Sequence, residues 1–271
     1  MPDIRQSKEF ADFMEKINWK ARREANLQFY IKNLPLLGPF IRIPRPPFPL
    51  DLIKAISLAK KHKAFAIRID YSPTKTIQIN LTQPLTSLLS QTSKDTRYGI
   101  RRAEKNKVVV EESKDVEVFI KMWHHNALRK GFWIPFAREI RSLYQSFGKN
   151  ALLLLAYSEQ NTRPISGALI LFHDKTAYYF YAASAPQGRR TSAPYLVIWE
   201  AIKKAKKKNF RTFDFEGIKD SRDKNTKNWG GFTHFKKGFG GKEIELPLSV
   251  SYYPNPLINM VAEIARSLRL S

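Results

Sequence analysis

The spacing of hydrophobic and polar residues divides the chain into alternating helices and strands. Apolar residues recur every three or four positions where a helix buries one face, and they form short runs or alternate in strands. Helices are predicted at residues 9–17, 51–62, 93–105, 116–129, 137–147, 194–207 and 257–268. Strands are predicted at residues 27–32, 40–43, 64–70, 77–81, 108–111, 151–157, 165–172, 177–183 and 211–215, with another inside 243–252.

Strands separated by helices occur in both halves of the chain, which favours an α/β (α+β) protein built from two mixed units. A length of 271 residues is enough for two domains of roughly 100–150 residues each. We expect a first, shortened domain at residues 1–92 and a second at 93–253. A C-terminal helix at 254–271 is expected to pack back on the first. The apolar runs at 151–157 and 165–172 predict strands covered on both faces.

The net charge is the most informative feature of the composition. Lys and Arg total 47 against 24 Asp and Glu, a formal net charge of +23, which attracts polyanions such as nucleic acid, anionic lipid or phosphorylated substrates. A protein that is basic only for solubility is the alternative. The absence of cysteine excludes disulfides and thiolate chemistry. The polar N-terminus lacks the apolar core of a signal peptide, so a cytoplasmic protein is expected.

Several common catalytic motifs are missing from the sequence. It contains no H-E-x-x-H, no G-K-[ST] phosphate loop, no G-x-S-x-G and no G-x-G-x-x-G. His124 and His125 are adjacent, so on a helix they point about 100° apart and do not share a metal from one face. We therefore expect neither a metal nor a dinucleotide cofactor.

Two basic clusters are candidate anion sites. In the helix predicted at 93–105, Arg97 and Arg101 are spaced i, i+4 and share a face, as suits phosphate oxygens; a solvated charged face is the alternative. The loop at 184–192 carries Gly188, Arg189 and Arg190 just before the helix predicted at 194–207, where free backbone N–H groups attract anions. An ordinary strand-to-helix loop explains the second cluster equally well.

Five segments together resemble the FemABX peptidoglycan-bridge aminoacyltransferases. They occur in that family's order and cover most of residues 93–245. They are Thr96–Lys105 (TRYGIRRAEK), 179–184 (YFYAAS), 194–202 (PYLVIWEAI), 213–218 (FDFEGI) and 229–241 (WGGFTHFKKGFGG). The first 92 residues are similar to the family only loosely.

The resemblance implies two GNAT-like domains in tandem and transfer of an amino acid from aminoacyl-tRNA to an amine of a peptidoglycan precursor. It assigns Phe235-Lys236 to the family's Phe-Lys pair, whose lysine stabilises charge developing during transfer. A fixed ammonium beside the oxyanion formed when an amine attacks an ester lowers the barrier.

The resemblance also assigns Tyr181 and Asp214 to substrate binding, with Asp70 at the end of a strand in the first half as a similar candidate. Asp214 is equally explained as a structural carboxylate at a strand end. The segment 187–192 lacks the Q/R-x-x-G-x-G/A spacing of coenzyme A-binding loops, so acetyl-coenzyme A is disfavoured and no cofactor is expected.

The expected partners are aminoacyl-tRNA and a lipid-linked or nucleotide-linked precursor, with peripheral contact at the anionic inner membrane face. Two alternatives remain open. One is a GNAT-like N-acyltransferase with another donor and a non-wall acceptor. The other is a non-catalytic RNA-binding protein with the same fold, because fold does not fix function.

Overall fold

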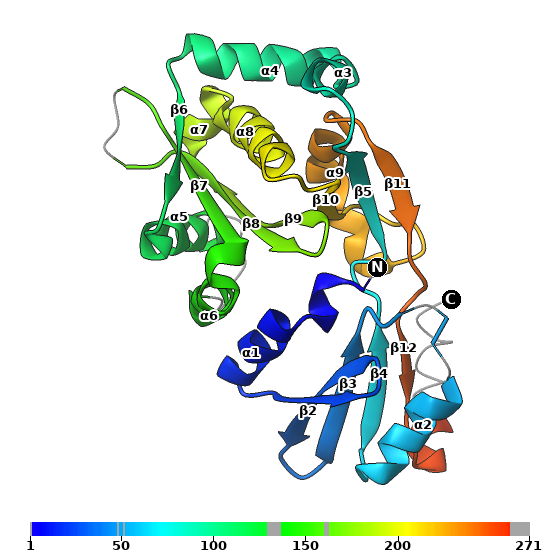
Figure 1. Cartoon of the computed structure of the whole chain (residues 1–271). Coiled ribbons are helices and arrows are strands. Elements are labelled where there is room, and N and C mark those ends of the chain that lie inside the picture. The colour runs from blue at the N-terminus through cyan, green and yellow to red at the C-terminus, as the bar shows by residue number, and fades with distance from the viewer. Residues whose placement is uncertain (1, 48, 51, 129–136, 160–162, 261–271) are drawn as a thin grey trace. The chain divides into compact units, whose positions relative to one another are not determined.

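The computed structural model describes residues 2–47, 49–50, 52–128, 137–159 and 163–260. The chain divides into two compact units, each with its own mixed sheet flanked by helices (Figure 1). Unit 1 is Met1–Ser72 with Pro247–Ser271, and unit 2 is Pro73–Leu246. The predicted α/β class is confirmed.

In the described part of unit 1, a five-stranded sheet has the order β1-β2-β3-β4-β12. Its elements are η1 (Ile4–Gln6), α1 (Lys8–Lys16), β1 (Lys20–Glu24), β2 (Leu27–Leu34), β3 (Gly38–Pro44), α2 (Leu52–Lys61), β4 (Ala66–Asp70) and β12 (Val250–Tyr252). Neighbouring strands are antiparallel except β3 and β4, which are parallel. The Ser7 hydroxyl caps α1 by accepting from the Phe10 amide at 3.1 Å.

Unit 2 contains a seven-stranded sheet among the described residues, in the order β11-β5-β10-β9-β8-β7-β6. Its strands are β5 (Lys75–Asn80), β6 (Val109–Ser113), β7 (Ala151–Tyr157), β8 (Ser166–His173), β9 (Thr176–Ser184), β10 (Thr212–Gly217) and β11 (Lys242–Glu245). Its helices are α3 (Leu85–Ser90), α4 (Lys94–Lys105), α5 (Val116–Leu128), α6 (Ala137–Phe147), η2 (Gly148–Asn150), α7 (Pro186–Arg190), α8 (Ala193–Lys207), η3 (Lys224–Trp229) and α9 (Gly230–Lys237). Only β9 and β10 pair in parallel in the described sheet.

The central strands of unit 2 are covered on both faces, as their apolar runs predict. Helix α8 packs on one face of the sheet, with α4 against it, and α5 and α6 pack on the other (Figure 1). Leu152, Leu154 and Ile170 belong to the core beneath α8, whereas Leu153 and Leu169 alternate with them and are also fully buried. Burial on both faces makes this sheet a rigid support for residues at its edge.

The boundary between the units differs from the predicted one at residue 92. Strand β5 pairs with β10 and β11, so residues 73–92 belong to unit 2. Strand β12 pairs with β4, so the chain returns to unit 1 from residue 247 instead of 254. Strand pairing between segments distant in sequence decides both cases, and local hydrophobic patterns do not report it. Residues 261–271 lie outside the described residues, so the packing of a C-terminal helix stays a prediction.

Candidate functional site

The parallel strands β9 and β10 separate partway along their length. They pair from Thr212 opposite Thr176 to Asp214 opposite Tyr178. Beyond that point β10 continues to Gly217 and β9 to Ser184 without further pairing to each other. Backbone groups on this stretch of β10 therefore need other partners, because a buried carbonyl without a donor is costly.

The side chain of Lys236 supplies such a partner. From α9, its Nζ donates to the backbone oxygens of Phe215, at 2.8 Å, and Gly217, at 2.6 Å. The residue is only 9% exposed. An ammonium has three N–H groups, and the part of the chain that the structure describes offers acceptors for two of them. The third has no hydrogen-bond acceptor among the described residues.

A bulge in β10 shapes the backbone that Lys236 contacts. The register with β5 shifts between Asp214 and Gly217, and Glu216 adopts a left-handed conformation with φ of 58°. The Asp214 carboxylate holds this bulge by accepting from the Glu216 amide at 2.7 Å and from Thr76 Oγ1 at 2.5 Å. Its second oxygen accepts from Gln78 Nε2 at 2.8 Å. A left-handed non-glycine residue costs about 1–3 kcal/mol unless its surroundings enforce it, and such strain is common at functional sites.

Burial lowers the pKa of Lys236 from 10.5 to about 8, while the carboxylates of Glu216 and Asp214 act in the opposite direction. At neutral pH the ammonium form therefore predominates, and it loses its proton through mildly alkaline pH. A desolvated ammonium beside a cavity acts more strongly on nearby charge than one in water.

A cavity of about 440 Å³ is lined by rings that surround this ammonium, although Lys236 itself is not part of the lining. Its aromatic wall is formed by Tyr179, Tyr195, Phe232 and Phe235, and its polar wall by Ser166, Ser184, Arg189 and Ser192. The Lys236 ammonium lies 5.7 Å from the ring centre of Tyr179 and 5.2 Å from that of Phe232. The cavity thus has the size and the mixed lining typical of small-ligand sites.

Phe235, the neighbour of Lys236 in sequence, is part of the aromatic wall. Its ring meets Tyr195 edge-on at 4.8 Å and Phe239 at 5.5 Å. Tyr195 in turn lies against Gly99 of α4, where an added Cβ would come within 2.7 Å of the ring. Of the predicted pair, Phe235 lines the cavity, whereas Lys236 lies behind the lining rings of Tyr179 and Phe232.

Ser192 contributes an unusual hydroxyl to the polar wall. It stands at the N-cap position of α8 but has φ of 63° and does not cap the helix with its side chain. It is 8% exposed, and its hydroxyl has no hydrogen-bond partner among the described residues. The hydroxyl is therefore available to a bound group.

The arginines predicted as phosphate ligands lie on α4, outside the cavity lining. Arg97 Nη1 donates to the backbone oxygens of Ser90, at 3.1 Å, and Thr92, which closes the C-terminal end of α3. Arg101 is exposed and its Nε reaches the Arg97 carbonyl at 3.4 Å. The structure gives Arg97 a structural contact and leaves Arg101 on the surface.

The structure separates the remaining predicted residues from the cavity. Tyr181 packs edge-on against Trp123 of α5, with ring centres 6.1 Å apart, and is not part of the lining. Asp214 supports the bulge instead of reaching the cavity.

Asp70 belongs to unit 1, where it forms an ion pair with Arg42 at 2.5 Å and accepts from Ser249 Oγ at 2.9 Å. Burial would raise the pKa of Asp70, but Arg42 and the other donors lower it overall. These contacts account for the Asp70 carboxylate structurally.

Tyr179, Ser192 and Phe232 lie inside segments that the sequence analysis names, but none of them was singled out as a site residue. Phe232 and Phe235 are three positions apart and are therefore neighbours on one face of a helix. A helix predicted at residues 230–237 would have placed Phe232 beside Phe235. Arg189 was predicted within a loop, but the structure forms the helix α7 there. Among the described residues, no group of three or more His, Asp or Glu could hold a metal ion.

Comparison with known proteins links this region to one family. A model of the FemAB family matches residues 157–267, which include the whole cavity lining. The lipid II:glycine glycyltransferases of two Staphylococcus epidermidis strains are 30% identical over 117 residues, which is 43% of this chain and 28% of each relative. The match thus spans less than a third of these relatives' length.

Solved structures extend the likeness to nearly the whole chain. The crystal structure of FemX has a TM-score of 0.80 at 19% identity, covering 96% of this chain and 94% of that one. The C-terminal domain of a putative lysylphosphatidylglycerol synthetase from Agrobacterium fabrum has a TM-score of 0.67 at 10% identity, covering 98% and 93%. At such identities the likeness concerns the fold. Taken together, these findings make the chain similar to the FemAB family over residues 157–267 and similar in fold to FemX over nearly its whole length.

Proposed function

We propose that the protein transfers an amino acid from aminoacyl-tRNA to an amine on the stem peptide of a peptidoglycan precursor. The observation that carries this proposal is the buried Lys236 ammonium, which keeps one N–H without an acceptor in the described chain and lies 5.2 Å from the ring centre of Phe232, a residue that lines a cavity of about 440 Å³. The family match over residues 157–267 and the glycyltransferase activity named for the curated relatives support the reaction class.

The proposed chemistry is attack of the acceptor amine on the ester carbonyl of the donor. A C–N bond forms, the C–O bond to the tRNA ribose breaks, and the proton lost by the amine passes to the leaving oxygen or to water. The carbonyl oxygen becomes negative in the transition state, and the free N–H of Lys236 would stabilise it. Removing a donor of this kind typically costs 10²–10³ in turnover.

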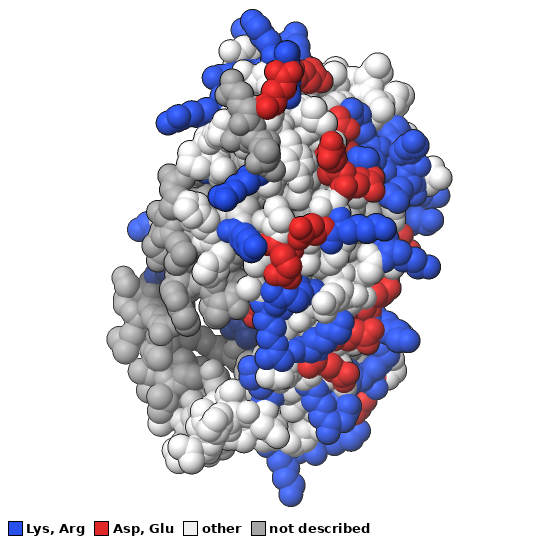
Figure 2. All heavy atoms as spheres, turned by 90° about the vertical axis from the view of Figure 1, so that its left-hand side faces the viewer, with Lys and Arg blue, Asp and Glu red and all other residues white. Residues whose placement is uncertain are grey.

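The donor and acceptor are proposed from charge as well as from family. A net charge of +23 suits a tRNA and the diphosphate of a precursor. Figure 2 shows that Lys and Arg side chains are more widespread than Asp and Glu on the face it displays. No described helix is long and apolar enough to cross a membrane. We propose that the reaction takes place on the cytoplasmic side, with any lipid-linked acceptor met at the membrane surface.

The cavity offers specific places for a bound aminoacyl group. Phe235 and Tyr195 present apolar ring surface, and Ser192 and Arg189 add hydrogen-bond donors to the same lining. Replacing Phe235 with Ala removes one aromatic wall without touching the ammonium. It should therefore raise KM for the donor more than it lowers kcat.

The test is a reconstituted reaction. Purified protein receives a mixture of aminoacyl-tRNAs with either a nucleotide-linked or a lipid-linked precursor, and mass spectrometry detects the new amide and identifies the residue added. Precursor whose mass never increases, whichever donor and acceptor are combined, would sink the proposal. Steep salt-dependent binding of uncharged tRNA without transfer would favour an RNA-binding protein instead. Transfer from an acyl-coenzyme A would favour an N-acyltransferase with another donor.

A further inference from the structure

The turn between β2 and β3 presents two neighbouring leucines to the outside of unit 1. Leu36 is fully exposed, at 106%, and Leu37 is 53% exposed. Leu36 also has φ of 65°, a conformation that bulky side chains rarely adopt. Single exposed leucines are ordinary. Two neighbouring ones at the tip of one tight turn form a small exposed apolar surface that does not pack into the described core.

Aromatic side chains surround the base of this turn. Trp19 lies 6.1 Å from Phe40, the third residue of β3, and Phe65 meets Tyr253 edge-on at 5.8 Å. The Phe65 amide donates to the Pro39 carbonyl at 2.7 Å, which fixes it at the same end of the sheet. All four rings are half-buried. Trp and Tyr side chains are enriched at membrane–water interfaces, and Trp19 and Tyr253 are two of these four rings.

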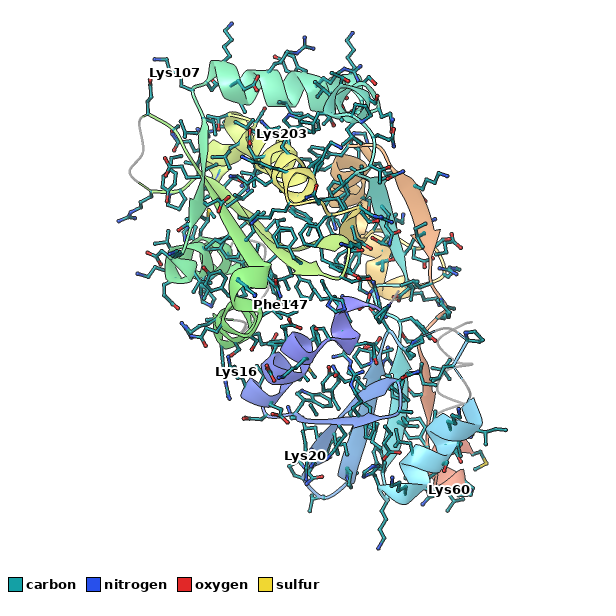
Figure 3. The ribbon with its side chains drawn as sticks, in the orientation of Figure 1. Lys16, Lys20, Lys60, Lys107, Phe147 and Lys203 are labelled. Atoms are coloured by element: carbon teal, nitrogen blue, oxygen red, sulfur yellow. The ribbon has the colours of Figure 1, made fainter. Side chains whose placement is uncertain are left out.

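Positive charge accompanies the aromatic residues. Lys32 places its ammonium 5.4 Å from the Trp19 ring centre, Lys20 follows Trp19 in sequence, and Lys63 lies two residues before Phe65. Figure 3 labels Lys20 and Lys60, both at the lower end of unit 1 in that view. Residues 27–69 contain a single acidic residue, Asp51. Lysines near a bilayer surface each add about 1 kcal/mol of attraction to anionic lipid.

We propose that this end of unit 1, the hairpin end (Trp19, Lys20, Lys32, Leu36, Leu37 and Lys63), docks on an anionic lipid bilayer. Leu36 and Leu37 insert below the headgroups, Trp19 lies at headgroup level, and the lysines contact lipid phosphates. Insertion supplies an apolar contribution that attraction between charges alone lacks, and both contributions together give stable peripheral binding.

The same features argue against other occupants. Nucleic acid offers no apolar phase for two projecting leucines. A stable protein interface needs roughly 800 Å² from each partner, far more than a two-leucine tip contributes. A bilayer can bury a small apolar tip in its hydrocarbon region, and its anionic headgroups attract the surrounding lysines. It therefore fits the hairpin end best.

The test measures binding of the full chain to phosphatidylcholine vesicles with and without phosphatidylglycerol, by co-sedimentation. Wild type should bind the anionic vesicles and leave the neutral ones nearly unbound. The double variant Leu36→Ser/Leu37→Ser should lower the partition coefficient at least about tenfold, because two leucines lose their apolar burial. Ile53→Ser is the matched control, since Ile53 is 78% exposed on α2 outside the hairpin end, and it should change binding little.

The charge contribution is tested with Lys20→Gln/Lys63→Gln. This variant should weaken binding to anionic vesicles about tenfold or more and flatten its salt dependence. Undiminished binding by the leucine variant overturns the proposal, as does equal binding of wild type to neutral vesicles. Loss of self-association, instead of lipid binding, in the leucine variant would also overturn it in favour of a second copy.

This proposal is independent of the proposed function, because the vesicles contain no donor or acceptor. Both leucine side chains are exposed, so the double variant should keep its circular dichroism spectrum and its melting temperature. It should also keep wild-type transfer to a nucleotide-linked precursor free in solution. A protein that binds vesicles but transfers nothing would refute the function alone, and the reverse result would refute the docking surface alone.

Discussion

Replacing Lys236 with Met tests whether this ammonium is buried in the folded protein as the structure places it. Methionine keeps most of the length and apolar volume of the side chain but removes the charge and the donors. The backbone oxygens of Phe215 and Gly217 then lose their partner. Each buried acceptor left without a donor costs about 1–3 kcal/mol, so the variant should be less stable at alkaline pH by several kcal/mol.

The pH dependence of this loss follows from the lowered pKa. In the unfolded chain a lysine titrates near 10.4, whereas folded Lys236 titrates at about 8. Between these values the unfolded state binds more protons, so this lysine makes stability rise with pH. The stability advantage of wild type over Lys236→Met should therefore grow by about 2 kcal/mol from about pH 7 to about pH 9.5.

Urea denaturation at a series of pH values, followed by circular dichroism, measures this difference. Subtracting the variant removes the contribution of every other titrating group. Lys237→Met is the control, because Lys237 is half exposed and pairs with Glu243 at 2.5 Å on the surface. A difference between wild type and Lys236→Met that stays constant with pH would refute the buried ammonium.

Three further substitutions test the packing of unit 2. Gly188→Ala would place a Cβ 2.1 Å from the Ile165 carbonyl oxygen, so α7 must shift and the free energy of unfolding should fall by about 3 kcal/mol. Gly230→Ala is the control, because a Cβ there meets nothing within 4 Å. In the same urea titration its free energy of unfolding should be unchanged or slightly higher. Hydrogen bonds from Arg222 are the main cause that lowers the pKa of Asp220, and they outweigh its burial. The contribution of Asp220 to the stability of wild type should therefore be lost as the pH falls below about 4. Asp220→Asn should be less stable than wild type at neutral pH and should lack this acid-dependent loss. If the free energy of unfolding of the two proteins fell equally with falling pH, the stabilising ion pair of Asp220 with Arg222 would be contradicted.

Much of the fold could be predicted from local patterns. The helix predicted at 194–207 appears as Ala193–Lys207, and the strand predicted at 151–157 appears with the same bounds. Periodicity and apolar runs determine such elements wherever burial is regular. Strand β1 was missed because four of its five residues are exposed, so its sequence KARRE carries no apolar alternation. The pairing of β5 with β10 was missed because it joins residues more than 130 positions apart.

The site was only partly predictable for the same reason. Lys236 was singled out through resemblance, since nothing in its local sequence distinguishes a buried lysine from an exposed one. Its burial depends on the separation of β9 from β10, which no single segment encodes. Asp214 was predicted as either a ligand of substrate or a structural carboxylate at a strand end, and in the structure its carboxylate accepts from the amide of Glu216, which has a left-handed conformation. Tyr181 follows a register shift in the pairing of β8 with β9, which a simple alternation of strand residues does not anticipate.

The central claim is that Lys236 stabilises charge during aminoacyl transfer. The most direct measurement is single-turnover formation of the new amide by wild type, Lys236→Met and Lys237→Met at saturating donor and acceptor. We expect wild type and Lys237→Met to react at similar rates and Lys236→Met to be slower by roughly 10²–10³, with little change in donor KM. Equal rates for Lys236→Met and wild type would contradict the claim.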